Sequence, residues 1–273
     1  MASGSILDTY GRESVTTAKV LCNKVAYAIV RSLNEPPQEG WVHSRWHWYR
    51  SPFSLRRKIL WSRPLGAWFY VEDEDSIENM LHLQDYEPVS WVAPEPGGIF
   101  LDVGAHIGWY TIRAARAIGE SGRVIALEPA ASNRNQLERN LALNKITSYT
   151  IVPLAAWSKS GPVRWSPSQV SVWNKVDESR GTEELEGIAL DDLVSKLSLP
   201  RVDWIKMDIE GAETEALRGA ATILRKFRPI LFIEVHECMA ELRGLLREFG
   251  YTIDRAAFDE LPERHGWILA RAL

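Results

Sequence analysis

A glycine-bearing turn between a strand and a helix constrains the fold of this chain more than any other feature. The segment 99–103 is apolar except for Asp102. Gly104 and Gly108 follow this segment, and a helical pattern then runs over 109–118. Glycine lets the backbone turn tightly and approach a ligand closely, and the free N–H groups of the helix start face the same turn. This spacing predicts the first strand–helix unit of an α/β sheet, with a ligand at the strand tip.

Strand and helix patterns alternate regularly after this turn. Apolar strand segments follow at 124–127, 149–152, 204–207, 230–235, 251–253 and 267–270, and helical segments at 132–143, 213–227 and 239–249. Apolar strands separated by helices are typical of a parallel sheet with both faces covered. No helix separates the last two strands, which predicts a hairpin and one antiparallel edge strand. The second helix is expected to begin with Ser132 as its N-cap.

Two regions lie outside this alternation. Residues 1–95 carry a helical stretch and a Trp-rich segment at 40–71 with six basic and no acidic residues, and they end at the Pro- and Gly-rich run 94–98. We therefore expect an N-terminal extension over 1–95, a candidate substrate lid, and a ligand-binding domain over 96–273. Residues 164–187 are polar and show no clear regular element, which predicts either an insertion beside the active site or a disordered loop.

The polar residues at the first two strand tips indicate the ligand. The GxxxG spacing of the turn differs from the GxGxxG of dinucleotide sites, whose bare N–H groups bind a pyrophosphate. Asp102 would repel a pyrophosphate, whereas it suits S-adenosylmethionine, which carries an ammonium group and a positive sulfur. Glu128 ends the second strand 20 residues beyond Gly108, where an acid can accept both ribose hydroxyls. Together these residues predict an S-adenosylmethionine site.

The sequence resembles the FkbM-type methyltransferases over residues 64–249. The motifs that carry the resemblance are LDVGAHIGWYT, GRVIALEP, LERNLALN, WIKMDIEGAETEALRGA and ILFIEVHE, of which KMDIEGAE is the most specific. The resemblance implies a Rossmann-like class I methyltransferase fold, with a mostly parallel sheet of seven strands and one antiparallel edge strand. It also implies methyl transfer from S-adenosylmethionine, commonly to oxygen on sugars and natural products and in some members to amide nitrogen.

The resemblance extends the cofactor site and marks where this chain departs from the family. The expected cofactor-binding residues are Asp102, Gly104, Ala105, His106, Gly108, Glu128, Ala155, Ala156 and Asp208. His106 stands where Asn is common in the first motif, and Ala130 and Ala131 follow the second strand tip where Asn-Pro is usual. Trp157 stands near the expected adenine position, where a small or acidic residue is usual. These departures bear on the substrate and adenine pockets.

The acceptor should bind at the tips of the fourth and fifth strands, because open α/β sheets bind ligands outside the carboxyl ends of their strands. Asp208 and Glu210 leave the fourth strand, and His236 leaves the fifth. An alcohol acceptor needs a base, and His236 titrates closest to neutrality. Asp208 is the alternative base, or it orients the acceptor hydroxyl. Glu210 is a third catalytic candidate, with a helix cap as its alternative role.

No metal is expected, and several protein classes are disfavoured. Asp208 and Glu234 offer oxygen ligands that would suit Mg²⁺, but two carboxylates are a weak signal, and no His/Cys cluster predicts zinc. Cys22 and Cys238 lie far apart, which favours a reducing compartment over a disulfide framework. No N-terminal apolar run reaches the roughly 20 residues of a membrane span. We therefore expect a cytoplasmic protein.

The leading functional expectation is O-methylation of a hydroxyl on a sugar or secondary metabolite, with a small molecule or glycan as acceptor. A nucleic-acid (RNA) methyltransferase is the first alternative, with the arginines of 45–63 binding phosphates. The net charge of −4 and the absence of an Asn-Pro-Pro-Tyr motif after the fourth strand disfavour it. A non-catalytic S-adenosylmethionine-binding module is the second, and the retained strand-tip acids argue against it. The oligomeric state and the role of segment 40–71 stay open.

Overall fold

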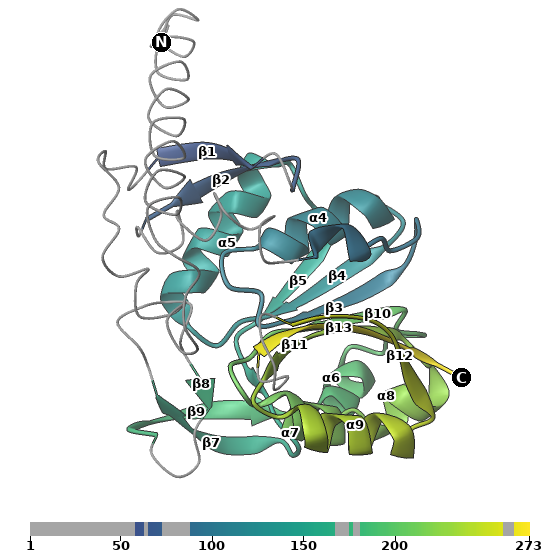
Figure 1. Ribbon diagram of the computed structural model, residues 1–273. Coiled ribbons are helices and arrows are strands. Elements are labelled where there is room, and N and C mark those ends of the chain that lie inside the picture. The colour runs from purple at the N-terminus through teal and green to yellow at the C-terminus, as the bar shows by residue number, and fades with distance from the viewer. Residues whose placement is uncertain (1–57, 63–64, 73–87, 167–174, 177–180, 259–264) are drawn as a thin grey trace, which may run out of the picture.

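The computed structural model describes residues 58–62, 65–72, 88–166, 175–176, 181–258 and 265–273. A seven-stranded sheet organises them, in the order β12-β13-β11-β10-β3-β4-β5 (Figure 1). Its strands are β3 (Ile99–Val103), β4 (Arg123–Leu127), β5 (Tyr149–Val152), β10 (Trp204–Met207), β11 (Ile230–His236), β12 (Tyr251–Phe258) and β13 (His265–Ala272). The five strands from β5 to β11 run parallel. The predicted Rossmann-like, mostly parallel sheet is confirmed.

The last two strands form the predicted hairpin. Strand β13 is antiparallel to both of its neighbours, β11 and β12. The reversed strand therefore lies between β11 and β12, one place in from the edge of the sheet. This insertion places His265 opposite His236 in the strand register.

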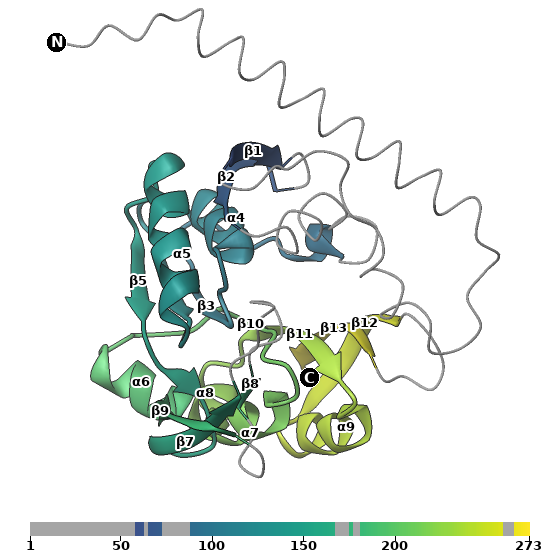
Figure 2. The ribbon, with the colours of Figure 1, turned by 90° about the vertical axis from the view of Figure 1, so that its left-hand side faces the viewer.

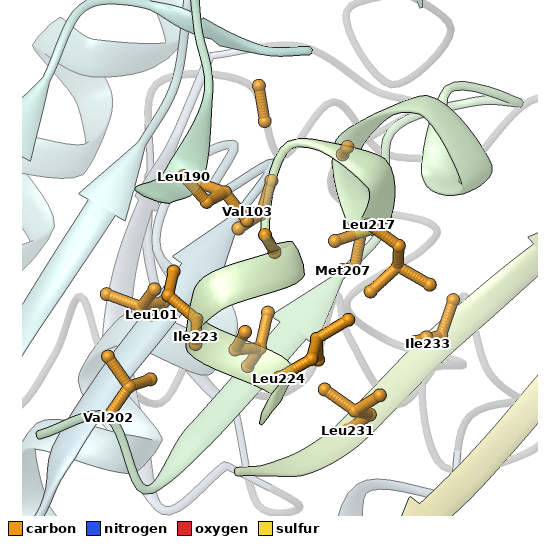
Figure 3. Close-up of a cluster of buried hydrophobic side chains, with 14 of the residues drawn as sticks. Leu101, Val103, Leu190, Val202, Met207, Leu217, Ile223, Leu224, Leu231 and Ile233 are labelled. Atoms are coloured by element: carbon orange, nitrogen blue, oxygen red, sulfur yellow. The ribbon is translucent and has the colours of Figure 1, made fainter. Parts of the chain in front are cut away.

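Helices cover both faces of the sheet (Figures 1 and 2). One face carries α4 (Trp109–Ile118) and α5 (Ala131–Leu143), and the other carries α6 (Leu190–Lys196), α7 (Glu213–Arg218), α8 (Ala221–Lys226) and α9 (Met239–Glu248). Because successive strand residues point to opposite faces, Phe100 packs with the α4 side, whereas Leu101 and Val103 pack with the α7–α8 side. Figure 3 shows this second cluster, in which Leu217 and Leu224 cover the strands.

Two of the predicted helix boundaries are wrong. Ser132 is not the N-cap of α5, which begins at Ala131 without a side-chain cap. The carboxylate of Glu128 accepts the N–H of Ala130, the N-cap residue itself, at 2.9 Å, so the strand tip is bonded to the residue that precedes the helix. The predicted long helix over 213–227 is two helices, α7 and α8.

Two contacts distinguish the junction between α7 and α8. At Gly219 an added Cβ would lie 2.2 Å from the backbone oxygen of Trp157, so another segment passes too closely for a side chain. The N–H groups of Thr222 and Ile223, at the start of α8, donate to the carboxylate of Asp191. That acceptor satisfies free N–H groups of a new helix start. Both partners are distant in sequence, so helical periodicity does not reveal them.

Residues 164–187 contribute to a second, smaller sheet. Its strands, in the order β6-β9-β7-β8, are β6 (Ala155–Ala156), β7 (Gly161–Ser166), β8 (Lys175–Val176) and β9 (Glu183–Ile188). The sheet lies beside α7 (Figure 1), and Trp165 of β7 lines the ligand pocket. The predicted place beside the site is confirmed, whereas the expectation of no regular element is wrong.

The described part of the N-terminal extension is a hairpin. Strands β1 (Lys58–Ser62) and β2 (Ala67–Val71) pair antiparallel, and η1 (Val89–Trp91) follows. Leu60 and Phe69 of this hairpin belong to the same buried cluster as the side chains of α4. The remainder of the predicted helical and basic extension lies outside the described residues, and the division at residue 95 stays a proposal. No helix in the described part is long and apolar enough to cross a membrane.

Candidate active site

A pocket opens at the carboxyl ends of β3, β4 and β10, where the predicted cofactor turn lies. It encloses about 820 Å³ of space including its open mouth. Seven of the nine predicted cofactor residues line it, and the other two, Asp102 and Gly108, do not. The seven are Gly104, Ala105, His106, Glu128, Ala155, Ala156 and Asp208. The structure therefore brings most of the predicted cofactor set to one cavity.

The two glycines shape the turn by different close contacts. Gly104 has a φ of 80°, and a Cβ there would lie 1.9 Å from the backbone oxygen of Asp208. Only glycine therefore lets the first and fourth strand tips approach so closely. Gly108 has a φ of 99° and precedes α4, and a Cβ there would lie 2.6 Å from Leu137 of α5. It therefore lets the start of α4 pack closely against the middle of α5.

Asp102 lies beneath the pocket rather than in its wall. Its side chain is fully buried, accepts a hydrogen bond from Thr111, and lies 3.6 Å from the ammonium of Lys206. Burial raises the pKa of Asp102 against the charge of Lys206. The buried Lys206 also donates to the backbone oxygen of Gly104 at 2.8 Å and lies 3.5 Å from Asp208. One buried cation therefore ties the turn to two strand-tip acids.

Glu128 is buried at the tip of β4 and lines the pocket. Its Oε2 accepts the backbone N–H of His106 at 2.8 Å, and its Oε1 accepts from the backbone of Ala130 at 2.9 Å and the side chain of Asn133 at 3.2 Å. Burial raises the pKa of Glu128, against these hydrogen bonds. The carboxylate is held rigidly. Oε1 already accepts two hydrogen bonds, whereas Oε2 accepts one and has a lone pair for another.

The three predicted catalytic residues lie together at the tips of β10 and β11. Asp208 and Glu210 line the pocket, and Nε2 of His236 lies 3.6 Å from Oε2 of Glu210. Glu210 has a φ of 55°, in the left-handed region that residues other than glycine rarely adopt. Strained backbone of this kind gathers at functional sites. The turn after β10 thus holds a carboxylate against the imidazole of the next strand.

Two further members of this cluster were not among the predicted site residues. The buried Glu213 contacts Nδ1 of His236 at 2.8 Å, and it also accepts the N–H of Gly211, just before α7, at 3.1 Å. His265 of β13 contacts Glu234 at 2.9 Å, and its ring centroid lies 5.2 Å from that of His236. Only strand register and helix packing create these pairs, so no local motif signals them.

Burial and neighbouring charges set the protonation of this cluster. Burial lowers the pKa of His236, but the hydrogen bond to Glu213 and nearby carboxylate charges outweigh it and raise the pKa to about 10. Burial raises the pKa of Glu210 to about 7, against the charge of His236. Burial also acts to raise the pKa of Asp208, but the charges of Lys206 and His236 hold it below its ordinary value. At neutral pH, Glu210 alone of these three is poised between its two forms.

Two overlapping sets of side chains could also hold a metal ion. Each set has ligand atoms within 4.8 Å of one another, and the sets are Asp208, Glu210 and His236, and Glu234, His236 and His265. The imidazoles in both sets already pair with carboxylates. The two metal candidates taken from the sequence, Asp208 and Glu234, fall in different sets. The expectation of no metal stays a prediction, which a chelator tests.

The fold and the pocket together define a class I methyltransferase that depends on S-adenosylmethionine. The cavity is lined by the turn at Gly104, by Glu128 at the second strand tip, and by Asp208 and Glu210 at the fourth. His236 of the fifth strand lies 3.6 Å from Glu210. The chain belongs to the FkbM methyltransferase family, because the model of the methyltransferase FkbM domain matches residues 102–253, more than half of the chain.

Characterised relatives and solved structures are similar to this chain at low identity. The hexuronic acid methyltransferase AglP of Haloferax volcanii is 26% identical over 170 residues, covering 61% of this chain and 67% of the relative. Methyltransferase sdnD of Sordaria araneosa is 25% identical over 218 residues, covering 66% and 84%. The crystal structure of a methyltransferase FkbM from Methylobacillus flagellatus aligns with a TM-score of 0.49 and 17% identity, covering 72% of this chain and 55% of that one.

Proposed function

We propose that the protein transfers the methyl group of S-adenosylmethionine to a hydroxyl of a sugar or another small molecule. The observation that carries this proposal is the placement of Glu210, with its pKa of about 7, in the wall of the cofactor pocket. A hydroxyl holds its proton tightly, so methyl transfer to it benefits from a base that is partly ionised near neutral pH. The relative named as a hexuronic acid methyltransferase supports a sugar acceptor.

The cofactor would lie across the strand tips in one direction. The turn at Gly104 to His106 would hold the amino-acid part, Glu128 the ribose, and Ala155 and Ala156 the adenine. This order puts the sulfur beside Asp208 and Glu210, where the acceptor enters. Bound there, S-adenosylmethionine supplies the transferable methyl group.

The proposed acid–base roles differ from the first expectation for His236. With a pKa of about 10, His236 is protonated at neutral pH and cannot take up a proton there. Glu210 instead accepts the proton of the acceptor hydroxyl. The hydroxyl oxygen would bond to the methyl carbon as the bond between that carbon and sulfur breaks. Asp208, ionised beside Lys206, orients the hydroxyl. The products are a methyl ether, S-adenosylhomocysteine and a proton on Glu210, which then passes to water.

Ligand-dependent thermal stability tests the cofactor directly. S-adenosylmethionine and S-adenosylhomocysteine should both raise the melting temperature, because ligand at 100 times its Kd stabilises the folded state by about 2.7 kcal/mol. NAD should have no effect, since the acids around the turn repel a pyrophosphate. Stabilisation by NAD and by neither adenosyl ligand would overturn the assignment.

Release of S-adenosylhomocysteine tests the acceptor class and the need for metal. A panel of hexuronic acids, neutral sugars, amines and short RNA should give turnover with one of the sugars. Turnover with RNA or amines alone contradicts the proposal, and cofactor binding without turnover on any acceptor supports a non-catalytic module. Chelator should leave the rate unchanged, whereas loss that Mg²⁺ restores would show a metal.

Removing the Glu128 carboxylate tests the ribose position. Glu128→Ala should weaken S-adenosylhomocysteine binding by roughly 2 kcal/mol, the scale of a charge-assisted hydrogen bond. The exposed Glu138 lies on the following helix α5, and Glu138→Ala is the matched control that should bind normally. Calorimetry on the folded variants measures both. Unchanged affinity in Glu128→Ala would remove this residue from the ribose site.

A further inference from the structure

One face of α5 carries a row of amide side chains, and most of them are paired with the edge of β2. Three backbone N–H groups of the β2 segment donate to this row at 2.7 to 3.1 Å. The pairs are Trp68 with Asn144, Tyr70 with Asn140, and Glu72 with Gln136. These amides act like the neighbouring strand that β2 lacks on this side, and they fix the N-terminal hairpin to the methyltransferase fold.

Asn133 stands one turn before this row and behaves differently. It is 2% exposed and lines the cofactor pocket, and Gln136 and Asn140 do not line it. Its Nδ2 donates to Oε1 of Glu128 at 3.2 Å. A carboxylate oxygen only accepts, so this bond fixes which end of the amide faces Glu128. The other end, Oδ1, has no hydrogen-bond partner among the described residues.

An amide oxygen that is buried without a partner lowers the stability of the folded protein, and a bound donor would recover that loss. The ionised carboxylate of Glu128 can only accept, so it cannot serve as that donor, whereas a hydroxyl of a bound ligand can. The cofactor groups nearest to Glu128 under the proposed function are the ribose hydroxyls. Each hydroxyl has one proton to donate, so two hydroxyls can serve two acceptors.

We propose that Asn133 is a second ribose-binding residue, whose Oδ1 accepts a hydrogen bond from one hydroxyl of S-adenosylmethionine while Glu128 accepts from the other. This inference rests on the proposed cofactor position and goes beyond it. It divides recognition of the diol between a carboxylate and an amide that are bonded to each other. The amide oxygen makes the pocket selective for a hydroxyl donor at that ribose carbon.

Deoxy analogues of the product give the decisive test, with calorimetry as the readout. In the wild type, 2′-deoxy- and 3′-deoxy-S-adenosylhomocysteine should each bind roughly three- to tenfold more weakly than S-adenosylhomocysteine. Asn133→Ala should weaken S-adenosylhomocysteine by a similar factor. In that variant one deoxy analogue should bind as well as the parent compound, because its missing hydroxyl no longer has a partner. The other analogue should keep its penalty at Glu128.

A control and a second variant keep the result interpretable. Gln136→Ala removes a bond to the hairpin and should lower the melting temperature without changing any affinity. If Asn133→Ala does not fold, Asn133→Leu keeps the volume and removes the same oxygen. If each deoxy analogue loses as much affinity in Asn133→Ala as in the wild type, relative to S-adenosylhomocysteine, the inference is wrong. Asn133 would then act only through Glu128. Failure of the wild type to bind S-adenosylhomocysteine would instead overturn the proposed function.

Discussion

Glu210→Gln should lower the rate of methyl transfer by about 10²- to 10⁴-fold, the usual cost of losing a general base. The amide keeps the size of the side chain but cannot take up the acceptor's proton. Affinity for S-adenosylhomocysteine should stay within about threefold, because the proposed cofactor contacts lie at other strand tips. Single-turnover rates and calorimetry separate the two effects. A variant that loses cofactor affinity and keeps its rate would contradict the assignment.

The same assignment fixes the direction of the pH dependence. Because a base works when ionised, the wild-type rate should rise with pH through about 7, the pKa of Glu210, and then level off. Glu210→Gln should lose this rise. The neighbouring Glu237, exposed at the tip of β11, supplies the matched control Glu237→Gln, which should keep both rate and profile. If the rate of Glu210→Gln still rises with pH through about 7, another group is the general base.

Asp208→Asn and His236→Ala complete this test of the strand tips. Each should lose most methyl transfer, because Asp208 orients the acceptor and the His236 cation holds Glu210 at 3.6 Å. Cofactor affinity should change little. If Asp208→Asn loses affinity as severely as Glu128→Ala, the fourth strand tip belongs to the cofactor site and the catalytic assignment is wrong.

Lys206→Met should lower the free energy of unfolding by about 3 to 5 kcal/mol, the cost of removing one partner of a buried ion pair. The methionine fills a similar volume but leaves the fully buried Asp102 without its cation. Urea unfolding measures the loss, and Lys196→Met, at an exposed position of α6, is the control.

Acid conditions give this prediction a second readout. The raised pKa of Asp102 should rise further without Lys206, and a carboxyl with a raised folded-state pKa is most stabilising when protonated. The loss in Lys206→Met should therefore shrink as pH falls. Adding Asp102→Asn, which removes the charge, should restore much of the stability at neutral pH. No gain in the double variant would show that the ion pair is not the cause.

Local patterns in the sequence determined the frame of this protein. The apolar runs predicted all seven strands of the main sheet, because strands that are buried on both faces are apolar along most of their length. The glycine turn and Glu128 located the pocket, since parallel strands carry their ligands at their carboxyl ends. The KMDIEGAE and EVHE motifs placed Asp208, Glu210 and His236 at neighbouring tips.

Only the tertiary structure decided which of these groups touch and how they ionise. The pairs Glu213–His236 and Glu234–His265 depend on strand register and helix packing between segments far apart in the chain. These contacts raise the pKa of His236 to about 10 and leave Glu210 as the group that titrates near 7. Propensity and periodicity act over a few residues, whereas burial and Coulomb interactions depend on distances that exist only once the chain has folded.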